Sequence, residues 1–198
     1  VTVANVVGRV RFNSNQVQIE SMKGTLGGGT LTASGGALLD GFSLSKFAIS
    51  VHGNDVTVPL PPGFRTTTDG DLEVKGTLRD PWITGTLNLR HVEYTQDIEL
   101  ADLINRRHDA TLSESGTESL LAQAHIDIRA EGRNALFVRN NIADLVASVS
   151  LRLSGEYDNP IISGRITATS GTLTFRNDRY ELARGLVELP FRPNADPV

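Results

Sequence analysis

The chain has 198 residues, of which 39% are hydrophobic, and a formal net charge of −4. This hydrophobic content is enough to build a core, which excludes disorder of the whole chain. The acidic balance, with no basic stripe, argues against nucleic acid as a partner. The chain has no cysteine, so neither a disulfide framework nor a thiolate site can form. No apolar run reaches the roughly 18 to 20 residues that a membrane-spanning helix needs.

Apolar and polar residues alternate through most of the chain. Near its start Val6, Gly8, Val10 and Phe12 share one face. Period-2 alternation of this kind is typical of half-buried β-strands. Further strands are predicted, in chain order, at 16–21, 24–34, 43–52, 55–60, 71–79, 82–95, 124–131, 135–139, 145–153, 161–169, 171–176, 179–183 and 186–191. Turn signals lie between them at Asn13-Ser-Asn, Gly35-Gly36, Gly53-Asn-Asp, Asp80-Pro81, Asn159-Pro160 and Arg176-Asn-Asp.

Two stretches of the sequence repeat each other. The first, at 72–89, reads LEVKGTLRDPWITGTLNL, and the second, at 151–168, reads LRLSGEYDNPIISGRITA. Both contain a glycine, a proline five residues later and a second glycine four residues after that. Each repeat predicts a strand, a tight turn and a strand. A repeated supersecondary unit indicates an elongated, stacked architecture.

Glycines inside these predicted strands are the unusual element. Gly76 and Gly85 are equally far from the Asp80-Pro81 turn, and Gly155 and Gly164 stand in the same relation to Asn159-Pro160. Glycine within a strand often marks a bulge or a bend. We therefore expect each pair to be neighbours across its hairpin, and the four glycines to curl the sheet along one continuous line.

One region, at 101–122, breaks the alternation. It reads ADLINRRHDATLSESGTESLLA and is largely polar, which predicts a mobile insertion with a short helix around 100–104. The chain is otherwise predicted to be one elongated β domain over 1–198. Because its first residues already follow a strand pattern, we interpret it as a fragment of a longer protein.

No convergent polar site is visible in the sequence. The four histidines lie apart, at His52, His91, His108 and His125. They lack metal-ligand spacing. Gly27-Gly28-Gly29 has no following Lys-Ser or Lys-Thr, so a turn is a better interpretation than a phosphate loop. Arg106-Arg107-His108 is interpreted as a solvated loop, with contact to anionic head groups as the alternative. We expect no catalytic residue, metal or cofactor.

The apolar face of the predicted strands leaves two architectures open. In one, two sheets bury it in a closed sandwich; in the other, a single sheet leaves it open as a ligand groove. The low aromatic content of 6% offers little to fill a sandwich. Candidate groove residues are Val10, Phe12, Leu72, Val74, Ile83, Leu87, Leu89, Ile126, Ile128, Val149, Leu151, Leu153, Ile162, Ile166, Leu173 and Phe175.

Three segments carry a family resemblance. They read AEGRNALFVRNNIADL at 130–145, LRLSGEYDNPIISGRI at 151–166 and SGTLTFRNDRYELARGLVEL at 170–189. In this order they resemble the C-terminal region of the TamB family, the inner-membrane-anchored periplasmic component of the translocation and assembly module, which is related to AsmA-like and bridge-like lipid-transfer proteins. The resemblance covers 124–198 well and 6–95 more loosely. It implies a β-taco: a long, curled, mainly antiparallel sheet folded into an open apolar groove.

The resemblance also implies a function without catalysis. The expected location is the periplasm of a Gram-negative bacterium, with the full-length protein anchored in the inner membrane. The expected cargo is phospholipid acyl chains or nascent outer-membrane β-strands, in phospholipid transport between the membranes, outer-membrane protein assembly, or both. The expected partner is a TamA-like outer-membrane assembly barrel. The alternative is a structural β-sandwich or β-solenoid segment of a stalk or adhesin, without a groove.

The last predicted strand is the expected docking edge for that partner. A long open sheet ends in an edge whose backbone N–H and C=O groups can pair with another chain. The residues expected to form this edge are Leu186, Val187, Glu188 and Leu189.

Overall fold

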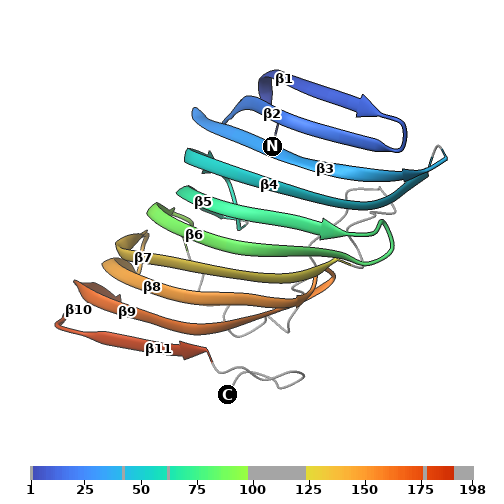
Figure 1. The fold of residues 1–198 in the computed structure, drawn as a ribbon. Helices are drawn as coiled ribbons and strands as arrows, with labels where there is room; N and C mark the ends of the chain where they lie inside the picture. The colour runs from blue at the N-terminus through green and yellow to red at the C-terminus, as the bar shows by residue number, and fades with distance from the viewer. Residues whose placement is uncertain (1, 42, 62, 98–123, 176–177, 190–198) are drawn as a thin grey trace.

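A computed structural model describes residues 2–41, 43–61, 63–97, 124–175 and 178–189. These residues form one eleven-stranded sheet without a helix (Figure 1). The strands are β1 (Ala4–Asn13), β2 (Gln16–Leu26), β3 (Gly29–Asp40), β4 (Ser43–Val58), β5 (Phe64–Gly76), β6 (Pro81–Tyr94), β7 (His125–Arg139), β8 (Ala143–Glu156), β9 (Asn159–Phe175), β10 (Asp178–Leu182) and β11 (Gly185–Leu189). The prediction of an all-β, curled open sheet is confirmed.

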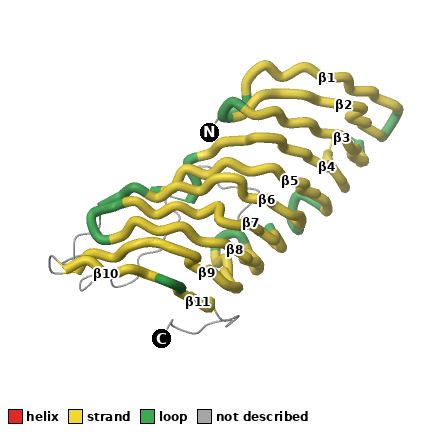
Figure 2. Tube along the Cα trace, turned by 90° about the vertical axis from the view of Figure 1, so that its left-hand side faces the viewer, coloured by secondary structure: helices red, strands yellow, loops and turns green. Residues whose placement is uncertain are grey.

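The strands lie in the sheet in their sequence order from β1 to β10. Neighbours are antiparallel except β6 and β7, which are parallel. The predicted insertion at 101–122 falls between these two strands, and with its predicted helix it lies outside the described residues. β11 pairs with the same strand, β9, as β10 does. Figure 2, a view turned by 90°, shows the strands following one another as a single layer.

Both sequence repeats form hairpins, as predicted. The 72–89 repeat is the β5–β6 hairpin, where Gly76 lies opposite Pro81. The 151–168 repeat is the β8–β9 hairpin, where Gly155 lies opposite Pro160. Equivalent positions therefore recur after three strands.

The predicted pairing of glycines within each hairpin is wrong. Gly85 lies opposite Leu72 and Gly164 opposite Leu151. The turn residues, 77–80 in the first hairpin and 157–158 in the second, lie ahead of the proline, so the first glycine of each hairpin pairs with the proline and not with the second glycine. At Gly85 and Gly164 the neighbouring strand approaches closely: an added Cβ would lie 2.1 Å from the Asp71 carbonyl oxygen and 2.2 Å from that of Ser150.

Some predicted boundaries differ from the structure. Gly35-Gly36 is not a turn but lies inside β3, where Gly35 faces Ile49. The predicted strand 24–34 is divided by a turn at Gly27-Gly28, and 64–70, which was not predicted as strand, begins β5. The turn expected at Asn159-Pro160 lies two residues earlier, since β9 already begins at Asn159. The turn signal at 176–178 falls largely outside the described residues.

A line of β-bulges crosses the sheet from β4 to β9. At each bulge one strand carries more residues than its neighbour, so the pairing register shifts and the strand bends. The shifts lie at 53–56 of β4 against 68–70 of β5, and at 67–68 of β5 against 89–91 of β6. They continue at 88–92 of β6 against 131–136 of β7, at 132–136 of β7 against 147–149 of β8, and at 146–147 of β8 against 168–170 of β9. Because these positions face one another across the strands, they form one line, which we call the crease.

Several of the buried apolar side chains flank the crease. Val56, Val92, Leu136 and Ala147 are only 0–9% exposed, although no second sheet covers them among the described strands. The pairing register places all four on the apolar face. A sheet that bends buries the side chains inside its own bend. The apolar face is therefore the concave, inner face, and the polar face is the outer one.

Candidate functional site

Apolar residues line the inner face from one side of the sheet to the other. One row, followed by pairing from β1 to β9, consists of Val10, Ile19, Gly35, Ile49, Val74, Ile83, Ile126, Gly155 and Pro160. Directly opposed residues of a sheet point to the same face. The row is thus an apolar track that runs across the strands.

The structure brings the predicted groove residues together on this inner face. All of them except Phe175 share it by register. Phe175 ends β9, and its side chain is outside the described residues. Ile162 is 53% exposed, whereas Val149 is 7% exposed, so the face is open at some points and filled at others.

Sequence reasoning missed part of the inner face. The missed residues lie mostly in β2–β4 and beside the crease: Ile19, Ile49, Val51, Val56, Val92, Leu136 and Ala147. In β4 the residues alternate regularly, so this pattern alone could have placed both Ile49 and Val51 on the inner face. Beside the crease the alternation slips by one residue, so the pattern alone did not connect its two sides.

A hollow with a wholly apolar lining lies on the inner face at the turn end of β3–β6. Its volume is about 350 Å³, and it is lined by Ala37, Leu44, Phe47, Ile49, Val74, Leu78 and Pro81. Ile49 and Val74 also belong to the apolar track. An apolar surface of this kind, without polar groups, suits a hydrocarbon ligand.

At the crease itself the inner face is filled by its own side chains. Val92, Leu136, Ala147 and Val149 form a buried cluster. Partly buried side chains pack against it: Phe64, Leu89, Val138, Leu145, Leu151, Ile166 and Ala168. The inner face is therefore filled at the crease, whereas the apolar hollow at the turn end of β3–β6 is open.

The outer face carries ion pairs between neighbouring strands. Arg152 donates from Nε and Nη2 to the two carboxylate oxygens of Asp127, at 2.7 and 2.8 Å. These hydrogen bonds lower the pKa of Asp127. The pKa of Asp69 is lowered by the backbone N–H of Asp55 and then by Arg90. These charged groups therefore lie outside the groove.

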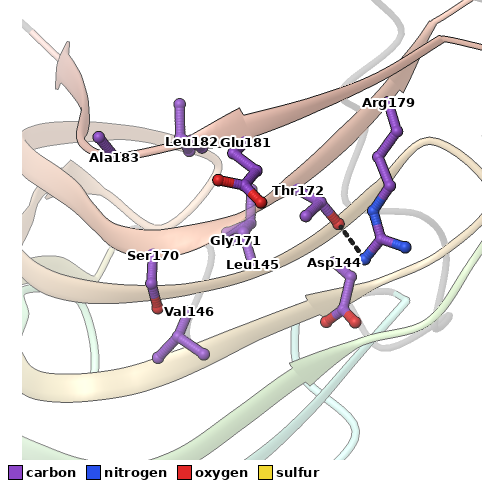
Figure 3. A pocket seen from close by; sticks show the side chains of 10 residues that line it. All are labelled: Asp144, Leu145, Val146, Ser170, Gly171, Thr172, Arg179, Glu181, Leu182 and Ala183. Atoms are coloured by element: carbon purple, nitrogen blue, oxygen red, sulfur yellow. Dashed lines mark hydrogen bonds between the residues drawn. The ribbon is translucent and has the colours of Figure 1, made fainter.

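A second hollow, of about 600 Å³, lies at the edge formed by β8, β9 and β10 (Figure 3). Asp144 and Glu181 line it together with Arg179, which donates to Thr172 Oγ1 at 3.4 Å. Its mixed lining of charges and hydroxyls does not suit a hydrocarbon chain.

The histidines within the described residues do not converge. His52 Nδ1 lies 2.7 Å from Asp71 Oδ1, and His125 Nε2 lies 3.2 Å from Asp80 Oδ1. The described residues contain no group of three or more His, Cys, Asp or Glu that could hold a metal ion. His108 lies outside the described residues.

The predicted docking edge is strand β11. Val187 pairs with Ile166, and Glu188 pairs with Arg165. Arg165 Nη2 donates a hydrogen bond to Glu188 Oε1 at 2.9 Å. Leu186 and Val187 are each 54% exposed. Across the described residues, no helix is both long and apolar enough to cross a membrane.

No curated protein and no solved structure matches the chain. A family model, described as the TamB C-terminal domain, matches residues 20–198. This match spans β3–β11, all of β2 but its first four residues, and both hairpin repeats. The chain therefore belongs to the TamB C-terminal domain family.

Proposed function

We propose that the inner face shelters hydrophobic cargo, foremost the acyl chains of phospholipids. The observation that carries this proposal is the apolar track from Val10 to Pro160, which no second sheet covers among the described strands. Apolar surface left open in this way usually marks a binding site.

The energetics of such a site follow from removing hydrocarbon from water. Each CH₂ group that an acyl chain buries contributes about 0.8 kcal/mol. Neighbouring strands lie roughly 4.8 Å apart, so a chain lying across them meets a new apolar residue at each strand. The charged residues on the outer face remain in water and do not oppose this contact.

The cellular setting follows from the family. Membership implies a periplasmic, envelope-associated segment. Within that setting we propose that the segment supports phospholipid transport between the inner and outer membranes. The full-length protein would be anchored in the inner membrane.

A role in outer-membrane protein assembly is the second candidate. It is favoured by the exposed strand β11, where Leu186 and Val187 present half of their surface to solvent. Such an edge can pair with a strand of a TamA-like outer-membrane barrel or with a nascent outer-membrane strand.

Native mass spectrometry of the purified protein tests the lipid proposal. Wild type should carry additional mass that matches phospholipid, and Val74→Asp, which puts a charge on the track, should lose it. Val74 and Glu73 are adjacent in β5 on opposite faces, so Glu73→Gln is the matched control and should keep the lipid. Wild-type protein without any bound lipid, after gentle extraction from membranes, would contradict the proposal.

A further inference from the structure

The outer side of the crease is bridged by polar groups that tie three strands at a time. In the first bridge the backbone N–H of Asp55 donates to Asp69 Oδ1 at 2.8 Å. Arg90 Nε donates to Asp69 Oδ2. One carboxylate in β5 thus joins β4 and β6 at the point where the register shifts on both sides.

A second bridge repeats this arrangement three strands later. The backbone N–H of Asn134 in β7 donates to Ser148 Oγ in β8 at 2.9 Å. The Thr169 hydroxyl in β9 donates to Asn134 Oδ1 at 3.1 Å. The backbone N–H and the side-chain oxygen of Asn134 therefore together join β7 to β8 and β9.

Both bridges are built around residues with left-handed backbone. Asp55 has a φ of 54° and Asn134 a φ of 50°. Asp and Asn tolerate this conformation better than other non-glycine residues. Each left-handed residue forms the bulge, and its N–H, which the interrupted ladder leaves free, is taken up by a side chain of the next strand.

We propose that Asp69, Asn134 and Thr169 are positioning residues that set how far the groove opens. Their bridges hold the bulges in one register, so that the strands bend by a fixed amount. Without a bridge the freed backbone groups can pair in other ways, and the bend relaxes. The effect on cargo rests on the function proposed above, whereas the effect on the bend does not.

Pairs of spin labels on one strand measure the bend directly. The chain has no cysteine, so two introduced cysteines are labelled uniquely. Arg65 and Lys75 are exposed residues of β5 on either side of Asp69. Asp69→Ala should lengthen and broaden the distance between labels at these two positions, and Asp69→Asn, which keeps one acceptor oxygen, should restore part of the change.

The matched control is Asp71→Ala on the same strand and face. Asp71 pairs with the exposed His52 side chain, off the crease. This variant should leave the distance distribution unchanged. If Asp69→Ala gives the wild-type distribution in a folded protein, the first bridge does not set the bend.

The second bridge has an isosteric test that avoids unfolding. With labels at Asp144 and Glu156 of β8, Thr169→Val should lengthen the distance, while Thr169→Ser, which keeps the hydroxyl, should not. Thr167→Val is the control at the neighbouring outer-face position of β9. Equal melting temperatures for Thr169→Val and Thr167→Val would separate positioning from general stability, and unchanged distances would overturn the proposal.

Bound lipid is measured on the same variants. Loss of lipid together with a longer distance supports both the bend and its role in binding. Longer distances with no lipid in any variant or in wild type would refute the proposed cargo and leave the bend established. Longer distances with full lipid loading would show that the bridges do not set the groove opening for cargo.

Discussion

Arg152 in β8 and Asp127 in β7 form a two-pronged ion pair on the outer face, with N–O distances of 2.7 and 2.8 Å. Their strands are paired so that Asp127 lies opposite Ser154, two residues beyond Arg152. The ion pair therefore spans the ladder diagonally. A slip of the register by one residue would move one partner to the other face and break it.

This ion pair predicts a pH dependence of stability. The hydrogen bonds from Arg152 lower the pKa of Asp127 in the folded state. A carboxylate with a lowered pKa stabilises the fold above its unfolded pKa of about 3.9, and this contribution is lost as the pH falls through the folded value. Because both side chains are more than a third exposed, the contribution is about 1 kcal/mol or less.

Denaturant unfolding of wild type and Asp127→Asn between pH 7 and pH 2 measures this contribution. The difference in free energy of unfolding should be constant above about pH 5 and shrink toward acid. A difference that stays the same throughout this range would contradict the assignment.

Charges on the inner face should have different effects at filled and open positions. Val149 is 7% exposed, and an unpaired charge there, as in Val149→Asp, should cost several kcal/mol and unfold the sheet. Leu153→Arg lies on the open part, where the long side chain can reach water, so the protein should stay folded and lose lipid. Ile166→Glu, beside the buried cluster, should fall between them.

Thermal melts and lipid loading of the three variants decide this prediction. Equal destabilisation by all three would mean that the inner face is closed throughout, as in a sandwich.

The close approach at Gly164 predicts a large effect of a single methyl group. Its φ is 128°, and an added Cβ would lie 2.2 Å from the Ser150 carbonyl oxygen. Gly164→Ala should therefore cost more than the roughly 1–2 kcal/mol of backbone strain alone. Gly28, with a φ of 90° and open space around it, is the matched control.

Urea unfolding compares the two glycine variants. Gly28→Ala should lower the free energy of unfolding only by the backbone strain, and Gly164→Ala should lower it clearly more. Equal losses would mean that β8 and β9 can separate at this point without cost.

Proline substitutions at two neighbouring positions of β11 should differ in their effect, and only one of them should block partner capture. Amide groups alternate in direction along a strand, so of Leu186 and Val187 one donates toward β9 and the other toward the open edge. Proline removes the donor. The variant that loses the outward donor should weaken binding of the proposed outer-membrane barrel and leave the melting temperature nearly unchanged, while the other should lower the melting temperature.

Pull-down of the barrel by Leu186→Pro, Val187→Pro and a deletion of 186–198 tests the edge. Full binding by all three variants would place the docking surface elsewhere.

The sequence predicted the strands and the hairpin repeats well because alternation and turn residues are local signals. It predicted the shared face of residues such as Leu72 and Leu153 for the same reason. The crease was missed, although it left a trace: the predicted strands 43–52 and 55–60 are one strand, β4, interrupted by the bulge at Asp55. The predicted strands 124–131 and 135–139 are likewise one strand, β7, interrupted at Asn134. Register between strands is not local, so only the structure aligns these interruptions into a line.

Site-specific photocrosslinking tests directly whether the inner face holds acyl chains. A photoreactive residue at Ile49 lies on the apolar track, and one at the adjacent Ser50 lies on the outer face. In cells or in lipid vesicles, Ile49 should crosslink phospholipid and Ser50 should not. Equal crosslinking at the two positions, or none at Ile49, would contradict a lipid-binding inner face.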